Sequence, residues 1–388
     1  MISRDKRLPK VTVAGGSLGG LCAGIALRGI GCDVNVFERT AGPMSSRGAG
    51  IVVQPDLMAL LASADAPELP ATMCLHRQFL DPDGGRRRVA APQQFTSWDA
   101  IYQTLRAAFP TERYHQGARL TGFEQTDETA TAHFEGRGDV TADMLVCADG
   151  SRSLSREILI KPQRVPTYAG YFAWRGTIEE SDAPSDLVQF FANCFSFCDA
   201  RSGGHILAYF IPGANASTKV GQRRINWVWY VHAQEGPELD ALLTDRKGTR
   251  RDGSVPPGLV CQRAVHGLYA RAAEQLHPRF ADLVRSTPDP FIQVIQDFAV
   301  EQMVFGRVLL LGDAAFIVRP HTAAATAKAA ADAMTLAASL QRRDRLSDAL
   351  ADWQRSRVAA GLNLTEYGVA LGERTAAAPP STAPSGEP

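Results

Sequence analysis

The sequence predicts an α/β fold with three parts: a nucleotide-binding lobe built on a parallel sheet, a mainly antiparallel β domain inserted into that lobe, and C-terminal helices. Three observations predict this fold. Residues 11–37 have a strand–helix–strand pattern. Residues 166–290 contain aromatic and apolar runs separated by Gly, Pro and Asn clusters. Residues 308–333 return to a buried strand, followed by a long alanine-rich helical pattern.

The first predicted elements form a βαβ unit. Residues 11–14 are short and apolar, as is typical of a buried parallel strand. Residues 18–28 have helical spacing, and 33–37 form a second strand that ends at Glu38. Strand, helix and strand in this order are the unit from which parallel sheets are built.

The remaining elements follow from spacing and turn residues. Helices are predicted at 57–64 and 98–109, and hairpins at 81–88 and 120–140, the second leading into the strand Met144–Cys147. Within the insertion, strands are predicted at 168–174, 188–197, 205–210 and 225–232, and helical turns at 237–244 and 278–286. Residues 303–311 regain parallel-strand character, and helices are expected from about 322 to 372.

These elements divide the chain into a discontinuous nucleotide-binding lobe and an insertion. The lobe is predicted to comprise residues 1–75, 98–165 and 291–372, the last segment including the C-terminal helices. The inserted domain comprises a hairpin at 76–97 and the antiparallel sheet at 166–290. Residues 373–388 are rich in Ala, Pro and Ser and are expected to be disordered.

Composition excludes several partners. Lys plus Arg and Asp plus Glu balance at 41 each, so neither nucleic acid nor an anionic membrane is predicted as a partner. No apolar run reaches the length of a membrane span, and the charged segment 1–10 indicates no signal peptide. The seven cysteines are an odd number without metal-ligand spacing, which indicates a reduced, cytoplasmic protein without a metal site.

The first motif is Gly15-Gly16-Ser17-Leu18-Gly19-Gly20. Gly15 permits a tight turn after the strand, and Gly20 permits close helix–strand packing. Between them, backbone N–H groups and the helix dipole can receive a pyrophosphate. Glu38 suits a ribose diol and would repel a 2′-phosphate. The alternative interpretation is a plain glycine turn.

The second motif is Val146-Cys147-Ala148-Asp149-Gly150, followed by Ser153 and Arg156. Its alternative interpretation is a strand that ends in an Asp-Gly turn, with Arg156 serving surface charge. The third motif lies in 308–333, where Asp313 follows a strand and precedes a helix. Asp313 there either accepts a ribityl hydrogen bond or caps a helix. Two nucleotide-type sites that bracket the chain suggest one large cofactor, and FAD fits.

Together, GGSLGG with Glu38, CADGSRS with Arg156, and GDAA with Pro320 and Asp332-Ala333 resemble the class A, single-component flavin-dependent aromatic hydroxylases. The resemblance extends from Gly15 to Ala333. Shorter segments indicate the branch that hydroxylates hydroxypyridines: GIVVQP at 50–55, TYAGY at 167–171, WRG at 174–176, IPG at 211–213, EGP at 235–237 and RPH at 319–321.

The resemblance implies a Rossmann-like FAD-binding domain of the aromatic-hydroxylase (glutathione-reductase-like) type. It implies NADH or NADPH as a transient reductant, O2 as co-substrate, and hydroxylation of a hydroxylated aromatic or N-heteroaromatic ring through a flavin C4a-hydroperoxide. Asp313 would hold the ribityl and pyrophosphate groups, and Pro320 would lie beside the isoalloxazine. The cofactor-binding residues that it implies are Gly15, Ser17, Leu18, Glu38, Arg39, Asp149, Asp313, Pro320, Ala323 and Ala325.

This sequence departs from the family pattern around the third motif. Phe316 replaces a frequent histidine, and Ala323, Ala325 and Ala327 stand where glycine, glycine and asparagine are usual. Alanine resists left-handed backbone angles, so the flavin-facing amides are expected to lie differently. Lys328 is a candidate source of positive charge near the flavin pyrimidine.

Attack on an electron-rich ring requires a group that accepts the proton of a ring hydroxyl. The catalytic candidates are His205, Tyr209, His321 and Pro320, and Tyr230 and Arg175 are further candidates for substrate contact. Each has an ordinary alternative role as a packing residue, a satisfied histidine or a surface ion pair. Trp227 and Trp229 are expected in the core or at an interface, and the aromatic sheet domain allows a homodimer.

Three other functions stay open from the sequence. One keeps FAD and performs epoxidation or oxygen insertion in natural-product tailoring. Another is a flavin-binding protein without hydroxylase activity, because the loop near 320–327 is altered. The last is a simple NAD-dependent dehydrogenase, which would be colourless when purified.

Overall fold

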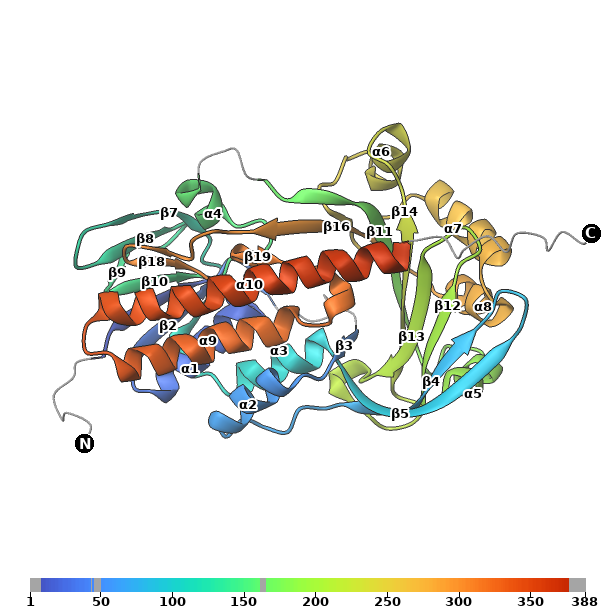
Figure 1. Cartoon of the computed structure of the whole chain (residues 1–388), viewed down its shortest axis with the longest axis horizontal. Helices are drawn as coiled ribbons and strands as arrows, with labels where there is room; N and C mark the ends of the chain where they lie inside the picture. Colours follow the sequence, from blue (N-terminus) through green and yellow to red (C-terminus); the bar gives the residue numbers. More distant parts are fainter. Residues whose placement is uncertain (1–7, 43, 45–49, 161–164, 377–388) are drawn as a thin grey trace, which may run out of the picture.

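The computed structural model describes residues 8–42, 44, 50–160 and 165–376, and these form two lobes with a long helix lying across both (Figure 1). That helix is α10 (Leu346–Ala376), and it packs on α9 (Ala325–Arg342). The expected disordered tail began at residue 373, but the helix continues to Ala376. The rest of the tail, 377–388, lies outside the described residues.

The first lobe contains a six-stranded sheet in the order β17-β18-β10-β1-β2-β6. The strands are β17 (Val304–Phe305), β18 (Val308–Leu310), β10 (Met144–Cys147), β1 (Lys10–Ala14), β2 (Asp33–Glu38) and β6 (Tyr114–Gln116). All neighbours are parallel except β17 and β18. The prediction of one parallel strand at 303–311 was therefore wrong at its start, because Gly306 adopts a φ of 64° and reverses the chain.

Helices pack around this sheet: α1 (Leu18–Gly29), α2 (Pro55–Ser63), α3 (Trp98–Ala107) and α9. All four were predicted within a few residues. The hairpin predicted at 120–140 is instead a three-stranded sheet of β7 (Leu120–Gln125), β8 (Ala130–Phe134) and β9 (Val140–Ala142). The third strand is only three residues long, too short for a periodic signal in sequence.

The second lobe is built on a ten-stranded mixed sheet. Its main path is β15 (Ser254–Val255), β16 (Phe291–Ala299), β11 (Thr167–Glu179), β14 (Arg224–His232), β13 (His205–Ile211), β12 (Cys194–Asp199), β4 (Thr72–Leu80), β5 (Arg86–Ser97) and β3 (Gly50–Val52). The tenth strand, β19 (Phe316–Ile317), pairs with β16. The predicted hairpin at 81–88 is the turn and start of a much longer hairpin, β4–β5, which joins the sheet alongside β12.

Four helices cover one face of this sheet: α5 (Ser185–Phe191), α6 (Pro237–Leu243), α7 (Gln262–Gln275) and α8 (Pro278–Ser286), on the right of Figure 1. The strand predicted at 188–197 is wrong in its first half, which belongs to α5. Helix α7 was not predicted, because only Leu268 and Ala272 of its residues are buried and its apolar stripe is weak.

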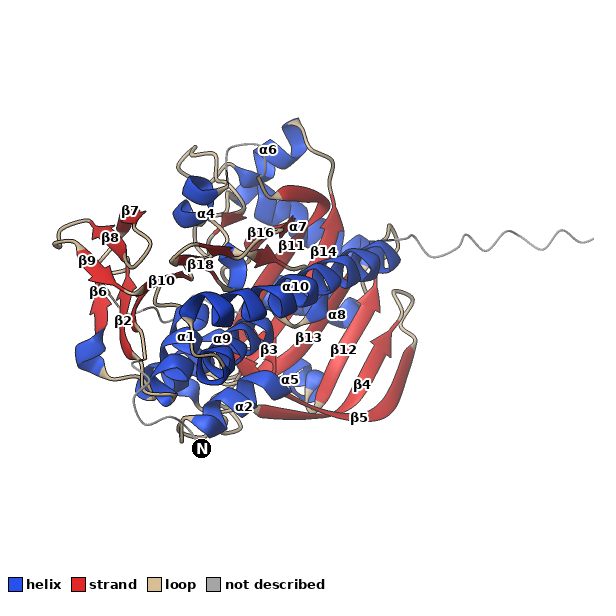
Figure 2. Cartoon of the chain, turned by 60° about the vertical axis from the view of Figure 1, so that its left-hand side comes forward, coloured by secondary structure: helices blue, strands red, loops and turns tan. Residues whose placement is uncertain are grey.

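The two faces of the large sheet have different chemistry. Trp227 and Trp229 are fully buried in the core beneath the helices, so the prediction that they are core residues is confirmed. Because side chains alternate along a strand, the intervening residues of β11, β13 and β14 point to the opposite face. That face carries His205, Tyr209 and Tyr230. Figure 2 shows the sheet itself, with β12, β4 and β5 as broad strands at the lower right. The boundaries predicted between the lobe and the insertion stay a proposal.

Candidate functional site

The three sequence motifs converge at the carboxyl edge of the parallel sheet. Gly15 follows β1, Glu38 ends β2, Asp149 lies two residues past β10, and Asp313 lies three residues past β18. The registers Ala14↔Cys147, Ala14↔Phe37 and Cys147↔Leu310 align the four strand ends. Open α/β sheets bind ligands at this edge. Motifs almost three hundred residues apart in sequence therefore form one site.

The glycine-rich turn is shaped by backbone contacts. Gly15 has a φ of 101°, and a Cβ there would lie 2.3 Å from the Ala148 carbonyl oxygen. A Cβ at Gly20 would lie 1.7 Å from the Gly15 carbonyl oxygen. Ser17 precedes α1 in an extended conformation without capping it, and Leu18 is the buried first residue of that helix. The N–H groups in the first turn of α1 therefore have no side-chain acceptor, and no acidic residue lies there. They are available to donate hydrogen bonds to a pyrophosphate.

Glu38 is a buried carboxylate that the backbone holds in place. Its Oε2 accepts from the Gly16 N–H at 2.8 Å, and its Oε1 accepts from the Thr40 N–H at 2.9 Å. It is only 5% exposed, and each oxygen retains a lone pair for a ribose hydroxyl. Arg39, the next residue, is exposed. The geometry is compatible with the predicted ribose acceptor.

Asp149 organises the second motif. It accepts from the Ser153 hydroxyl at 2.5 Å and from the Ser155 N–H at 3.0 Å. The Ser153 oxygen in turn accepts from the Arg156 N–H and caps α4 (Leu154–Leu159). Asp149 therefore shapes the turn beside Gly15, whose substituent would meet the Asp149 Cα at 3.0 Å.

Arg156 is not a surface residue, so the alternative interpretation of the second motif was wrong on this point. Its side chain is 4% exposed and stacks on Phe298. Its guanidinium donates to the carbonyl oxygens of Asp313 and Ala314, each at 3.3 Å. Arg156 therefore ties the second motif to the third.

Asp313 lies in η3 (Gly312–Ala314), just past the end of β18. Its side chain is solvent-exposed, yet desolvation by the surrounding protein raises the pKa of its carboxyl, while Lys328 and Arg156 oppose the rise. Solvent exposure combined with desolvation indicates a concave position rather than a convex surface. A ribityl chain fits this description.

Lys328 also stabilises the turn at Gly312. Its Nζ donates to the Gly312 carbonyl oxygen at 2.8 Å and lies 3.4 Å from Asp332. Asp332 also accepts from Arg357 at 2.6 Å. The Lys328 charge is therefore buried and paired with Asp332, which makes it a support of the Gly312 turn.

The alanine-rich loop keeps a glycine-like backbone. Pro320 and His321 lie in η4 (Pro320–Thr322), and Ala323 follows with φ 51° and ψ 20°. The expectation that alanine would alter the loop conformation was therefore wrong at Ala323, which accepts the left-handed angles at a cost in strain. Ala325 is exposed and begins α9, whose first turn has no side-chain cap. That N-terminus is suited to negative charge on a flavin pyrimidine.

These observations fit FAD across the whole edge. In this arrangement the glycine turn would receive the diphosphate, Glu38 a ribose, Asp313 a ribityl hydroxyl, and the α9 N-terminus would face the ring. No group of three or more His, Cys, Asp or Glu residues suited to a metal ion occurs in the described part of the chain.

On the sheet lobe, three of the predicted substrate residues form one cluster. The rings of Tyr230 and His321 lie 4.2 Å apart, those of His205 and Tyr230 5.0 Å, and those of His205 and His321 5.6 Å. Tyr171, which was not among the predicted site residues, joins this cluster, and its hydroxyl lies 2.9 Å from His321 Nε2. Its position in alternation with Ala173 and Arg175 was the available signal.

The histidines of this cluster are neutral at pH 7. Burial lowers the pKa of His205 to about 4. Burial lowers the pKa of His321 to about 3, and the nearby His205 and Arg319 act in the same direction. Burial raises the pKa of Tyr171 to about 12. Neutral imidazoles can accept a hydrogen bond from a bound ring hydroxyl, but the burial that lowers their pKa values also makes them weak proton acceptors until a nearby negative charge stabilises the imidazolium.

Tyr209 and Arg175 share this sheet face but lie outside the cluster. Tyr209 stacks on Phe95 with centroids 4.1 Å apart. Arg175 donates to Gln293 Oε1 at 2.5 Å. Arg175 is therefore not the surface ion pair of the alternative interpretation.

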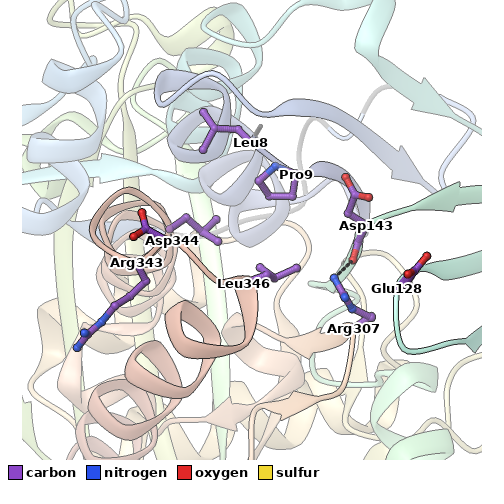
Figure 3. Close-up of a pocket in the computed structure, with 9 residues that line it drawn as sticks. Leu8, Pro9, Glu128, Asp143, Arg307, Arg343, Asp344 and Leu346 are labelled. Carbon is purple, nitrogen blue, oxygen red and sulfur yellow. Dashed lines mark hydrogen bonds between the residues drawn. The ribbon is translucent and has the colours of Figure 1, made fainter. Parts of the chain in front are cut away.

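A hollow of about 300 Å³ lies elsewhere (Figure 3). It is lined partly by Pro9, Asp143 and Arg307, which directly precede β1, β10 and β18. It therefore opens at the amino edge of the parallel sheet, opposite the motifs, and takes no part in the candidate site.

The fold, the three joined motifs and the sheet face define an FAD-dependent enzyme that acts on aromatic rings. The chain belongs to the class A FAD-dependent aromatic monooxygenases. NADH or NADPH is the reductant typical of this family. A family model described as FAD binding domain-like matches residues 168–297.

The relatives support this assignment. The chain is 37% identical to the 2,6-dihydroxypyridine 3-monooxygenase of Paenarthrobacter nicotinovorans, over 91% of this chain and 88% of the relative. The solved 2,6-dihydroxypyridine-3-hydroxylase from Arthrobacter nicotinovorans has a TM-score of 0.89 and 34% identity, covering 97% of this chain and 96% of the other. A Klebsiella pneumoniae HpxO structure with FAD and uric acid shares the fold, with a TM-score of 0.74, 20% identity and coverage of 95% and 89%.

Proposed function

We propose that this enzyme hydroxylates a hydroxylated N-heteroaromatic ring, with dihydroxypyridines as the first substrates to test. The observation that carries the proposal is the cluster of neutral histidines and phenols on the sheet face. The similarity to a 2,6-dihydroxypyridine 3-monooxygenase supports the same ring class.

The cofactor and the protein residues are proposed to have different roles. Bound FAD would supply the reduced-oxygen chemistry of hydroxylation. Gly15, Ser17, Leu18, Glu38, Arg39, Asp149, Asp313, Pro320, Ala323 and Ala325 stay our proposed cofactor-binding set. Among them, the buried Glu38 and the desolvated Asp313 are the carboxylates best placed to accept hydrogen bonds from FAD hydroxyl groups.

We propose His321 and His205 as the groups that accept the ring proton. His321 is held by the Tyr171 hydroxyl, and the Nδ1 atom of His205 is buried without a hydrogen-bond partner. Deprotonation makes the ring carbon more electron-rich. Because burial lowers the pKa values of both histidines, the imidazole accepts the proton only where the negative charge left on the ring stabilises the imidazolium beside it. Tyr209 and Pro320 stay candidates for substrate contact.

The test is turnover by the FAD-loaded enzyme. We expect 2,6-dihydroxypyridine to accelerate NADH or NADPH oxidation and to give a product with one added oxygen atom derived from 18O2. The same assay with 6-hydroxynicotinate and with urate defines the ring preference, because two relatives are named for acting on these rings. Reductant consumption that yields only hydrogen peroxide with all three rings would contradict the proposal.

We also propose a cytoplasmic homodimer. All seven cysteines are free, and six are buried, which suits a reducing compartment. No membrane-spanning helix is found among the residues that the structure describes.

For the dimer, the β4–β5 hairpin offers a surface for a second copy, with the exposed apolar residues Met73, Leu75 and Val89. Light scattering during size-exclusion chromatography distinguishes a dimer from a monomer.

A further inference from the structure

The sheet face that carries His205 also carries other buried polar atoms without partners. Among the described residues, seven buried side-chain polar atoms lack a hydrogen bond. Three of them, Arg175 Nε, His205 Nδ1 and Asn226 Nδ2, belong to the neighbouring strands β11, β13 and β14 and to the same face. Buried polar atoms without partners are rare in native proteins, so three on one face indicate a ligand that supplies the partners.

The orientation of the Asn226 amide is fixed. Its Oδ1 accepts from the Gly50 N–H at 2.9 Å, and a backbone N–H can only donate. The unpartnered atom is therefore the NH2 group, a pure donor, and Asn226 is 0% exposed. The amide interacts weakly with the Tyr209 hydroxyl, which lowers the tyrosine pKa against the effect of burial, but this contact uses at most one of its two N–H groups.

Arg175 brings a positive charge to the same face. Its Nη1 donates to an uncharged amide, Gln293, and within the described residues no carboxylate forms a salt bridge with it. The charge acts on both Tyr209 and Tyr230, lowering their pKa values against the effect of burial, so it lies within reach of both phenols. A half-buried cation whose Nε atom is buried and which has no acidic partner favours an anionic ligand.

The spacing of these groups matches a small ring. Asn226 lies opposite Tyr209, and His205 lies four residues before Tyr209 on β13, which places the backbones about 13 Å apart at 3.3 Å per residue. Arg175 and Leu207 both pair with Val228. Since Leu207 lies midway between His205 and Tyr209 on β13, Arg175 lies midway between these two residues along the strand direction. A six-membered ring with two oxygens and a hydrogen bond of about 3 Å at each end spans a comparable distance.

We propose that Asn226 and Arg175 form a donor pair that binds a second, anionic oxygen of the ring substrate, at the end of the ring away from His205 and His321. The pair selects rings that carry two oxygens over rings that carry one. This inference rests on the proposed function and adds to it the residues that determine ring specificity.

The test compares two probes in the FAD-loaded enzyme: 2,6-dihydroxypyridine and 2-hydroxypyridine, which lacks one oxygen. Binding is read from the change in the flavin absorption spectrum. The wild-type enzyme is expected to prefer the two-oxygen ring. Asn226→Asp keeps the acceptor for Gly50 and replaces the free donor by an acceptor, so the affinity for 2,6-dihydroxypyridine should fall about tenfold to a hundredfold. The affinity for 2-hydroxypyridine should change much less.

Arg175→Met provides a second test if Asn226→Asp does not fold. It removes the charge and keeps an apolar stem, and it should also reduce the preference for the two-oxygen ring by about tenfold or more. Thr12→Val is the matched control, because Thr12 is another buried residue with an unpartnered oxygen but lies in β1 of the other lobe. It should leave the preference and the FAD content unchanged.

The outcomes separate the two proposals. If the wild-type enzyme hydroxylates 2,6-dihydroxypyridine and both variants keep its affinity and preference, the donor pair is overturned and the proposed function stands. If the wild-type enzyme neither binds nor hydroxylates either ring, the proposed function fails and the donor pair fails with it. Loss of preference in the folded, FAD-containing variants supports the pair.

Discussion

The nucleotide end of the site and the substrate-facing sheet differ in how their polar groups are satisfied. At the nucleotide end, both oxygens of Glu38, both oxygens of Asp149 and the Arg156 guanidinium have protein partners. On the sheet, Arg175 Nε, His205 Nδ1 and Asn226 Nδ2 have none. The charged groups of the first region are held before any ligand arrives, although Ser155 Oγ beside Asp149 also lacks a partner, whereas the second region leaves three buried polar atoms for a ligand to satisfy.

This difference predicts which substitutions affect cofactor binding and which affect turnover. A cofactor that stays bound suits a rigid site made from backbone and fully paired side chains. A substrate that enters and leaves at each turnover must itself complete the polar network. Substitutions at the nucleotide end should therefore affect cofactor retention and folding, and substitutions on the sheet should affect turnover with FAD still bound.

The largest effect is expected from Gly20→Ala. The new Cβ would lie 1.7 Å from the Gly15 carbonyl oxygen, so the turn and helix α1 must separate. We expect loss of FAD from the purified protein and a lower melting temperature. Gly29→Ala in the same helix is the control, because no atom lies within 4 Å of its added Cβ. Equal flavin content in the two variants would contradict the role of Gly20.

The next largest effect is expected from His321→Ala and His205→Ala. Each removes a neutral imidazole from the cluster, and removal of a general base typically lowers the rate about 10²- to 10⁴-fold. FAD should stay bound, which the flavin absorbance per protein measures. His266→Ala, on the exposed side of α7, is the control. Full turnover in both cluster variants would place the proton acceptor elsewhere.

A smaller effect is expected from Glu38→Ala. The change leaves the N–H groups of Gly16 and Thr40 without their carboxylate and removes the ribose acceptor, at a cost of about 1–3 kcal/mol. FAD affinity, measured by titrating the apoprotein, should fall about tenfold or more. Glu38→Gln should have an intermediate effect because it keeps one acceptor oxygen. Unchanged affinity in Glu38→Ala would show that the ribose lies elsewhere.

The smallest effect is expected from Ala323→Gly, at the border between the two regions. Glycine removes the strain of the left-handed backbone, about 1–2 kcal/mol, but adds chain entropy to the unfolded state, so a net stabilisation of about 1 kcal/mol or less is expected. Ala324→Gly is the matched control, because Ala324 has a φ of −109° and gains no such relief. A destabilised Ala323→Gly variant would contradict the assignment of strain.

Local patterns were sufficient for much of the fold. Strands β1, β2, β10 and β18 and helices α1, α2, α3 and α9 have clear patterns, and their positions were predicted within a few residues, whereas the three-residue strand β6 was not predicted. The failures occur where the local signal is weak or ambiguous. Residues 188–191 are apolar enough for a strand, but Leu187 and Phe191 lie four residues apart and pack together on α8 as a helix face. Helix α7 buries too little for its period to be visible.

For the site, the sequence by itself identified the candidate cofactor-binding residues, because glycine turns and strand-ending acids are local features with local physical causes. The tertiary structure decided which of them meet. Arg156, which the alternative interpretation placed at the surface, joins two motifs, and the only sequence signal at Tyr171 and Asn226 was their alternation along a strand. Strand register and sheet face set these contacts, and both depend on pairing between segments far apart in the chain.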